Sequence, residues 1–198
     1  LYLGLAAPLQ VTDPASAETI KYASNAFLAT KISFVNAIAA VCEAVGADVN
    51  DVVLGMGYDK RIGDAFLRPG PGWGGSCFPK DSHALVKIAE DAGYDFGLLK
   101  GVIDVNEDQF RRVADKVEAA AGGDLDGVTV AVWGLTFKAR TDDLRDSPSL
   151  EIIGRLRSRG AKVRAYDPAI EGGSDDPRLE GIEVVGDPYA ACEGAAVL

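Results

Sequence analysis

Apolar side chains recur at helical spacing along residues 16–121, with one long interruption. The stretch from Ser16 to Gly46 contains no proline and no earlier glycine, which predicts one long helix with Asp13 or Ser16 as its N-cap. One apolar line on this helix is Ile20, Phe27, Phe34 and Val41, and a second is Leu28, Ile32, Val35, Ala39 and Cys42. So wide an apolar arc predicts a helix that is packed on several sides. The second line is headed by two polar residues, Lys21 and Asn25, which break the pattern.

Shorter helical patterns follow, separated by a loop rich in glycine and proline. Helices are predicted at residues 48–54, 79–92 and 96–121, and the loop occupies residues 55–76. A loop of that length inside a compact domain is usually functional or disordered. Residues 16–123 are therefore predicted to form an all-helical central domain. Residues 1–15 contain two prolines and little pattern, which indicates a connector.

After Gly123 the periodicity changes to that of an α/β unit. Residues 128–133 form a short continuous apolar run, which is typical of a buried parallel strand. A helix is predicted to begin after Ser147 as N-cap, followed by strands at 162–166, 182–185 and 195–198. This β-α-β order predicts that residues 124–198 form part of a Rossmann-like domain, so the fold class is α/β overall.

Composition and charge exclude several classes of protein. The chain has 198 residues, a formal net charge of −10 and a pI near 4.6, whereas a nucleic-acid binder normally carries the opposite balance. No run approaches the ~20 apolar residues of a membrane span, so no membrane association is expected. The three cysteines are far apart and not in Cys-x-x-Cys spacing. We therefore expect no metal site and no disulfide framework, and a reducing, cytoplasmic compartment.

Cys77 is the candidate nucleophile. It follows a Gly-Gly-Ser stretch and precedes a predicted helix, whose exposed N–H groups would stabilise a thiolate, the reactive form of the side chain. Asp81 lies one turn further on and would share a face with it. Lys21 and Asn25 together offer an ammonium and an amide N–H, which suit an oxyanion or a water. The alternatives are a small buried cysteine and an ordinary solvated pair of polar residues on a helix surface.

The chain contains no dinucleotide-binding fingerprint in the required setting. Residues 70–75 formally match Gly-x-Gly-x-x-Gly, but no strand precedes them and Pro69 and Pro71 disrupt the strand–turn–helix context. Gly134, after the strand at 128–133, has no further glycines in register. The glycine-rich segment is therefore interpreted as a flexible substrate loop.

Four segments, in this order, carry a resemblance to a known family. They are residues 16–29, 61–67 (Arg-Ile-Gly-Asp-Ala-Phe-Leu), 72–81 (Gly-Trp-Gly-Gly-Ser-Cys-Phe-Pro-Lys-Asp) and 133–148. The chain resembles the nucleotide-sugar dehydrogenases, the UDP-glucose/GDP-mannose dehydrogenase family. Within the family, the segments before Cys77 are most similar to those of members that act on UDP-glucose.

The resemblance implies a two-step oxidation of UDP-glucose to UDP-glucuronate with NAD as cofactor. Cys77 would form a thiohemiacetal and then a thioester, Lys21 and Asn25 would stabilise oxygen anions, and Asp81 would help to activate water. The implied cofactor contacts are Cys77, Lys80 and Arg145. The implied substrate-binding residues are Lys21, Asn25, Arg61, Phe66, Arg68, Gly72, Trp73, Gly74, Phe137 and Lys138.

The resemblance also implies a homodimer and further domains outside this chain. Arg61 would reach the substrate of a partner subunit across a homodimer built on the long helix. Residues 1–15 would connect to an N-terminal NAD-binding domain that this chain lacks, and residues 124–198 would be an incomplete UDP-sugar-binding domain. The isolated chain is therefore expected to be inactive. Three alternatives stay open: a dehydrogenase for another nucleotide sugar, a 6-phosphogluconate-type enzyme without a covalent cysteine, or a non-catalytic dimerisation and nucleotide-binding module.

Overall fold

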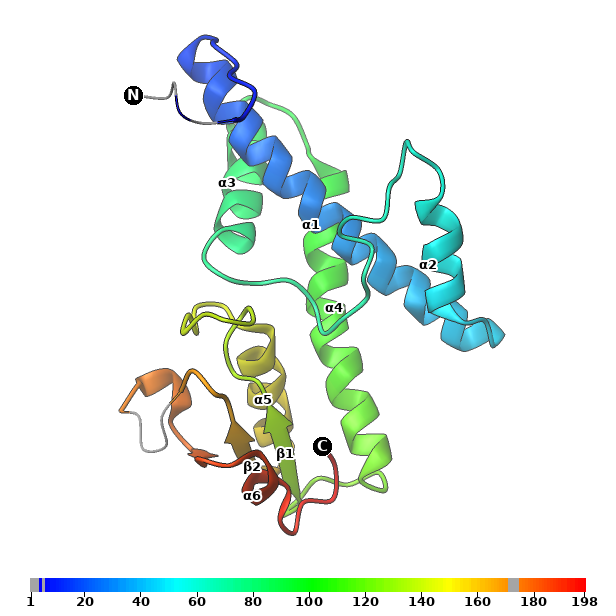
Figure 1. Ribbon diagram of the computed structural model, residues 1–198, viewed down its shortest axis with the longest axis vertical. Helices are drawn as coiled ribbons and strands as arrows, with labels where there is room; N and C mark the ends of the chain where they lie inside the picture. The colour runs from blue at the N-terminus through cyan, green and yellow to red at the C-terminus, as the bar shows by residue number, and fades with distance from the viewer. Residues whose placement is uncertain (1–3, 5, 171–174) are drawn as a thin grey trace.

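The computed structural model describes residues 4, 6–170 and 175–198, and it has a helical part and a smaller α/β part (Figure 1). The helices of the first part are α1 (Pro14–Val45), α2 (Val49–Gly57), α3 (Phe78–Asp91) and α4 (Gly97–Ala120). The second part contains β1 (Thr129–Trp133), α5 (Pro148–Ser158), β2 (Lys162–Tyr166), the short 3₁₀ helix η1 (Pro177–Leu179), β3 (Ile182–Val184) and α6 (Pro188–Cys192). A mixed helical chain with a small parallel sheet agrees with the predicted fold class.

The long helix α1 has clear signals at both ends. The Asp13 side chain accepts a hydrogen bond from the Ser16 N–H at 2.9 Å, so Asp13 is the N-cap. Pro14 follows in the first turn, where its missing N–H costs nothing. The helix ends at Gly46, whose φ of 73° is the left-handed conformation common after a helix C-terminus.

Within the described residues, α1 is packed by three other helices, as the wide apolar arc predicts, but one apolar line stays uncovered. Helices α2, α3 and α4 contact α1, whose buried residues include Asn25, Ala29 and Val35. The line of Ile20, Phe27, Phe34 and Val41 stays at least 50% exposed. A sequence pattern cannot distinguish the two faces, because both are apolar.

Helix α1 also has the length and composition of a membrane span, which the sequence analysis did not anticipate. Among the described residues it is the one helix that meets both criteria, with a mean hydropathy of 1.5 over its most apolar window. Only 28% of that window is buried within the chain. Packing against α2, α3 and α4 covers part of the apolar surface of α1 (Figure 1), and the line of Ile20, Phe27, Phe34 and Val41 stays exposed.

The sheet of the α/β part is parallel throughout, in the order β1-β2-β3. Val130 pairs with Val163, which in turn pairs with Ile182. On the free edge of β1, Val130 forms a single parallel bridge with Val197, where a fourth strand was predicted. The resulting order, with the last segment beside β1, is that of the first half of a Rossmann sheet.

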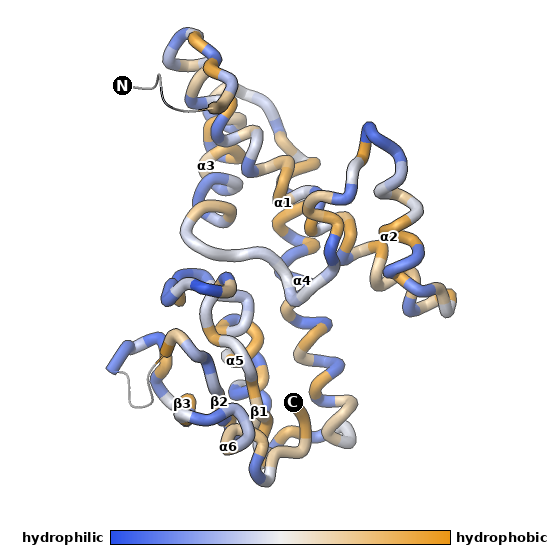
Figure 2. Tube along the Cα trace, in the orientation of Figure 1, coloured by the Kyte–Doolittle hydropathy of each residue, from blue (hydrophilic) through white to orange (hydrophobic). Residues whose placement is uncertain are grey.

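Helix α4 belongs to both parts of the molecule. Its first half packs against α1 and α3 through Leu99 and Val102, and its second half packs against α5 and β1 through Phe110 and Ala114. Figure 1 shows the helix running from the side of α1 down to the sheet, and Figure 2 shows apolar residues along α1 and β1. The loop that carries Cys77 lies beside the middle of this helix, where the two parts meet.

Candidate active site

Cys77 is the residue immediately before α3, at its N-cap position, and its side chain is exposed. The first bond of the helix runs from the Asp81 N–H to the Cys77 C=O, at 2.8 Å. The thiol therefore lies at the end of α3 where backbone N–H groups are free, a position that stabilises a thiolate. Cys42, by contrast, is buried in the helical part, as expected for a core cysteine.

The residues singled out on the long helix converge on Asp81. The Asn25 Nδ2 donates to Asp81 Oδ2 at 2.6 Å, and the Lys21 Nζ lies 3.8 Å from the same oxygen. The Lys80 Nζ donates to the other carboxylate oxygen at 2.5 Å. Asp81 and Asn25 are buried, whereas both lysines are mostly exposed. Lys21 and Asn25 are therefore part of one polar cluster with Asp81, one helical turn from Cys77.

This cluster keeps Asp81 ionised. Burial alone is the largest single influence and would raise the pKa of Asp81, since a carboxylate loses hydration inside the protein. The hydrogen bonds from Lys80 and Asn25, together with the charges of Lys80 and Lys21, outweigh it, so the pKa of Asp81 lies below its ordinary value. At neutral pH the site therefore presents a buried, ionised carboxylate.

The loop between β1 and α5, residues 134–147, contacts the Cys77 loop from the α/β part (Figure 1). The Gly75 N–H donates to the Asp146 C=O at 3.0 Å. A Cβ on Gly75 would lie 2.5 Å from the Phe137 ring, and one on Gly74 would lie 1.9 Å from the Asp146 carbonyl oxygen. Both glycines are needed for this contact, because any side chain would collide with the opposite loop.

Two cations, Lys80 and Arg145, interact electrostatically with Cys77. The pKa of Lys80 is raised first by its hydrogen bond with Asp81, and the pKa of Arg145 first by its hydrogen bond with Asp143; Cys77 contributes to both. Lys138 follows Phe137 in the same loop, and its side chain is exposed. These positions would suit an anionic ligand placed over Cys77.

A second group of predicted substrate residues lies elsewhere on the chain. Arg61 is exposed and pairs with Asp59 at 2.6 Å. Phe66 adopts a left-handed φ of 63° and, with Arg68, lines a hollow beside α2 whose lining does not include Cys77. Within one chain the structure does not bring Arg61, Phe66 and Arg68 to the thiol, so their roles stay predictions.

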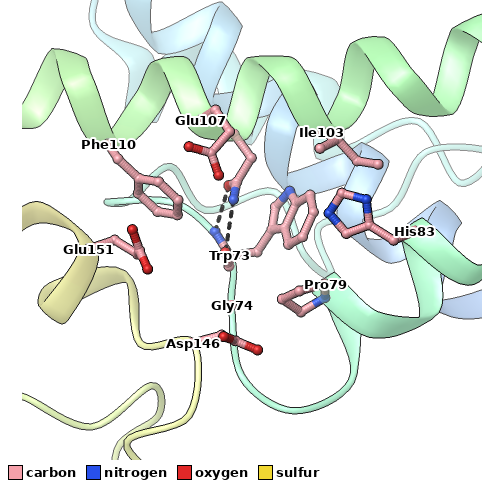
Figure 3. A pocket seen from close by; sticks show the side chains of 10 residues that line it. Trp73, Gly74, Pro79, His83, Ile103, Glu107, Phe110, Asp146 and Glu151 are labelled. Carbon is pink, nitrogen blue, oxygen red and sulfur yellow. Dashed lines mark hydrogen bonds between the residues drawn. The ribbon is translucent and has the colours of Figure 1, made fainter. Parts of the chain in front are cut away.

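A small pocket of about 100 Å³ lies behind the Cys77 loop and is lined by residues of α3, α4 and α5 (Figure 3). Figure 3 shows the Trp73 indole beside Ile103, His83 and Pro79. The pocket is lined by Trp73, Gly74, Pro79, His83, Ile103, Asn106, Glu107, Phe110, Asp146 and Glu151. Trp73 and Gly74, both predicted to bind substrate, thus face this pocket as well as belonging to the loop.

The sequence analysis missed two residues at this junction. Asp146 has a left-handed φ of 46°, which turns its carbonyl towards Gly75; the sequence carries no signal for this. Asn106 is buried and bonds both backbone groups of Trp73. Its signal was available, because it is a polar residue on the apolar stripe of α4 that contains Leu99 and Phe110.

The described residues fit only part of a dinucleotide site. The start of α3 offers backbone N–H groups beside Cys77, and Lys80 and Arg145 add positive charge, which suits a diphosphate. Residues 70–75 follow a loop and not a strand, so they are not a dinucleotide fingerprint. Among the described residues, no cluster of three or more His, Cys, Asp or Glu side chains is placed to hold a metal ion.

Comparison with known proteins identifies matching domains and relatives. Residues 15–108 match the central domain of the UDP-glucose/GDP-mannose dehydrogenase family, and residues 131–198 match its UDP binding domain. The chain is 50% identical over 200 residues to a UDP-glucose 6-dehydrogenase of Rhizobium meliloti, covering 100% of the chain and 45% of that protein. It is 51% identical over 187 residues to UDP-glucose 6-dehydrogenase TuaD of Bacillus subtilis, covering 94% of the chain and 40% of that protein.

A solved structure agrees with these matches. The UDP-glucose dehydrogenase of the hyperthermophilic archaeon Pyrobaculum islandicum superposes with a TM-score of 0.90 at 38% identity, covering 99% of this chain and 46% of that one. The chain thus spans less than half the length of these relatives.

Proposed function

The chain belongs to the UDP-glucose/GDP-mannose dehydrogenase family, and we propose that it forms the central and C-terminal parts of an NAD-dependent UDP-glucose 6-dehydrogenase. The observation that carries this proposal is the exposed Cys77 at the start of α3, one turn from the buried Asp81 and its partners Asn25 and Lys21. The proposed reaction converts the C6 alcohol of UDP-glucose to a carboxylate, giving UDP-glucuronate.

The proposed covalent chemistry runs through the Cys77 sulfur. NAD, when bound, supplies the acceptor for the two electrons removed from C6 in each of the two oxidations. The Cys77 thiolate adds to C6 of the aldehyde and forms a thiohemiacetal, which the second oxidation converts to a thioester. Water then attacks C6, the C–S bond breaks, and the carboxylate leaves with the thiolate regenerated.

The polar cluster on α1 and α3 would serve the oxygen atoms of this sequence. Lys21 and Asn25 would donate to the oxygen anion that develops on C6, since both are donors of the polar cluster around Asp81, one helical turn from Cys77. Asp81, ionised at neutral pH, would accept a proton from the attacking water. Cys77, Lys80 and Arg145 would contact NAD, whose own binding domain would precede residues 1–15.

The proposed UDP-sugar site draws on both parts of the chain. Residues 68–74 and the pair Phe137–Lys138 would contact the substrate of the same subunit, which is supported by the contact between Phe137 and Gly75. Phe66 would complete that set, and Arg61 would reach the partner subunit in a homodimer formed through α1. We propose a cytoplasmic enzyme, because the free thiol has to stay reduced.

Replacing the nucleophile tests the proposal. In the full-length enzyme, with an N-terminal NAD-binding domain, Cys77→Ser should lower kcat for NADH formation from UDP-glucose by a factor on the order of 10³ or more. Cys192→Ser is the matched control and should retain turnover, since Cys192 lies in α6, where its thiol donates to the Pro188 carbonyl. Acid-quenched wild-type enzyme should carry the uronyl group on the Cys77 peptide by mass spectrometry.

Two results would contradict the proposal. Near-normal turnover by Cys77→Ser would favour the 6-phosphogluconate-type chemistry, which needs no covalent cysteine. NADH formation by the isolated 198-residue chain would show that the NAD site is complete within it. Turnover with another nucleotide sugar in place of UDP-glucose would keep the mechanism and change only the substrate.

A further inference from the structure

The glycine-rich loop before Cys77 has almost no backbone hydrogen bonding of its own. Within the described part of the chain, residues 68–74 make no hydrogen bond to another backbone group. Pro69 and Pro71 remove two N–H donors, but the half-buried Gly70 and the buried Trp73 each retain a donor and an acceptor. Such groups need partners, because an unpaired buried backbone group costs about 1–3 kcal/mol.

Side-chain amides supply all four of these bonds. The Asn106 Oδ1 accepts from the Trp73 N–H at 2.8 Å, and its Nδ2 donates to the Trp73 C=O at 2.9 Å. The Gly70 N–H donates to Asn36 Oδ1 at 2.8 Å, and Gln109 Nε2 donates to the Gly70 C=O at 2.8 Å. We call Asn36, Asn106 and Gln109 the amide clamp; it attaches the loop to α1 and α4.

The clamp is held by the packing around it. Gly72 lets the loop approach α4, since a Cβ there would lie 3.0 Å from Asn106 Oδ1 and 2.5 Å from the Phe110 ring. The Trp73 indole donates to Ser33 Oγ at 2.9 Å and belongs to the core of the helical part. The buried Nδ2 of Asn36 has no partner among the described residues, so this amide is retained at a cost while its oxygen serves the loop.

We propose that Asn106 is the positioning residue that fixes the Cys77 loop. It hydrogen-bonds both the N–H and the C=O of Trp73, four positions before Cys77. Asn36 and Gln109 instead bond the N–H and the C=O of Gly70, seven positions before Cys77. The opposite side of the same loop is held through Gly75 by the Asp146 carbonyl. Asn106 therefore fixes the position of the loop relative to α4 and the α/β part. The position of the loop in turn determines where the Cys77 thiol lies.

Amide hydrogen exchange in the 198-residue chain tests this directly. In Asn106→Leu, a change of similar volume, the Trp73 N–H should exchange at least about tenfold faster, as expected for the loss of its acceptor. The Gly70 N–H, bonded to Asn36, should change by less than about twofold. Val102→Ala is the control, because it removes a buried apolar contact from the same core and leaves both Trp73 bonds in place. An unchanged Trp73 N–H, or a general acceleration equal to that of Val102→Ala, would overturn the inference.

A charge-dependent variant separates hydrogen bonding from packing. A protonated carboxyl group has one donor and one acceptor, like the amide, whereas a carboxylate has acceptors only. In Asn106→Asp the carboxylate would still accept from the Trp73 N–H, but it could not donate to the Trp73 C=O and would place a buried charge against that carbonyl, so the loop should open more often. Burial raises the pKa of such a carboxyl group, so the protection of Trp73 relative to wild type should be lower at about pH 8 than at about pH 5. A ratio that is the same at both pH values would show that only the shape of the side chain matters, against the inference.

Turnover provides the functional readout, and this part rests on the proposed function. In the full-length enzyme, Asn106→Leu should lower kcat about tenfold through misplacement of the thiol, while Val102→Ala stays within about twofold. If Cys77→Ser is inactive but Asn106→Leu keeps its kcat, the positioning role is wrong and the proposed function stands. If Cys77→Ser is active, the proposed function is wrong, and the exchange measurements still decide the role of Asn106 in holding the loop.

Discussion

At the scale of single residues, the junction next to Cys77 depends on glycines that allow two loops to touch. Gly74 and Gly75 face the Asp146 carbonyl and the Phe137 ring at distances that no side chain could occupy. Asp146 itself holds a left-handed φ of 46°, which is an uncommon conformation for a residue other than glycine. The contact thus combines two permissive residues with one strained residue, a combination found at functional sites.

A glycine in a close contact between loops and a glycine at an open helix position should respond oppositely to replacement by alanine. Gly74→Ala should destabilise the chain by about 1–3 kcal/mol, since the new Cβ collides with backbone that can move only if the loops separate. Gly154→Ala is the matched control: it lies in α5 with nothing within 4 Å of its Cβ and should stabilise by about 0.5–1 kcal/mol. Urea unfolding of both variants measures these changes. Equal stability of the two variants would contradict the close contact between the loops.

At the scale of elements, α1 is the helix with the most unburied apolar surface. Its exposed line repeats every seven residues, and Leu98 at the start of α4 adds to it. The groove beside this line is lined by apolar residues of both helices, including Phe34, Leu98 and Val105. An apolar surface of this extent is typical of a protein interface, which supports the proposed homodimer through α1.

A charge placed in the centre of this line should prevent self-association. Phe27→Glu should convert the chain from a dimer to a monomer, because an unpaired carboxylate would be buried at the interface. Sedimentation velocity at micromolar concentration measures the outcome. Tyr189→Glu, at an exposed aromatic in α6, is the control and should leave the mass unchanged. A monomeric wild type, or a Phe27→Glu variant that still dimerises, would rule out this interface.

At the scale of the whole molecule, α4 joins the helical and α/β parts into one folding unit. Arg159, the residue after α5, forms ion pairs with both Asp115 and Glu118 of α4, and Phe110 packs into the core beneath the sheet. These surface ion pairs contribute little on their own, so the apolar contacts of α4 are the main connection. The domain boundary predicted after residue 123 lies where the hydrophobic periodicity changes. The apolar contacts of α4 with α5 and β1 extend across this boundary.

Shortening Phe110 should therefore weaken both parts together. Phe110→Ala should cost about 3–5 kcal/mol, since the ring is buried and the cavity cannot be filled. In a Trp133→Phe background, Trp73 fluorescence reports on the helical part, and far-UV circular dichroism reports on the whole chain. The two urea transitions should coincide and shift to lower concentration together. Separate transitions would mean that the two parts unfold independently.

The sequence by itself determined the elements of this protein and the candidates for its chemistry. Caps, prolines and apolar periods act within a few residues, so α1, α3, α4, β1 and β2 were predicted close to their observed bounds. The prediction erred at α2, which continues through Gly55 to Gly57, because one glycine weakens a helix without always ending it. Cys77 and its position at the start of a helix were equally local features.

Only the tertiary structure decided which of these residues meet. Asn25 and Asp81 are 56 residues apart, and Asn106 and Trp73 are 33 apart, so their bonds depend on how α1, α3 and α4 pack. Periodicity reports which side of a helix is apolar, but not which partner covers it or how far along the partner the contact lies. For that reason the buried face of α1, the clamp on the Cys77 loop and the turn at Asp146 followed from packing and not from pattern.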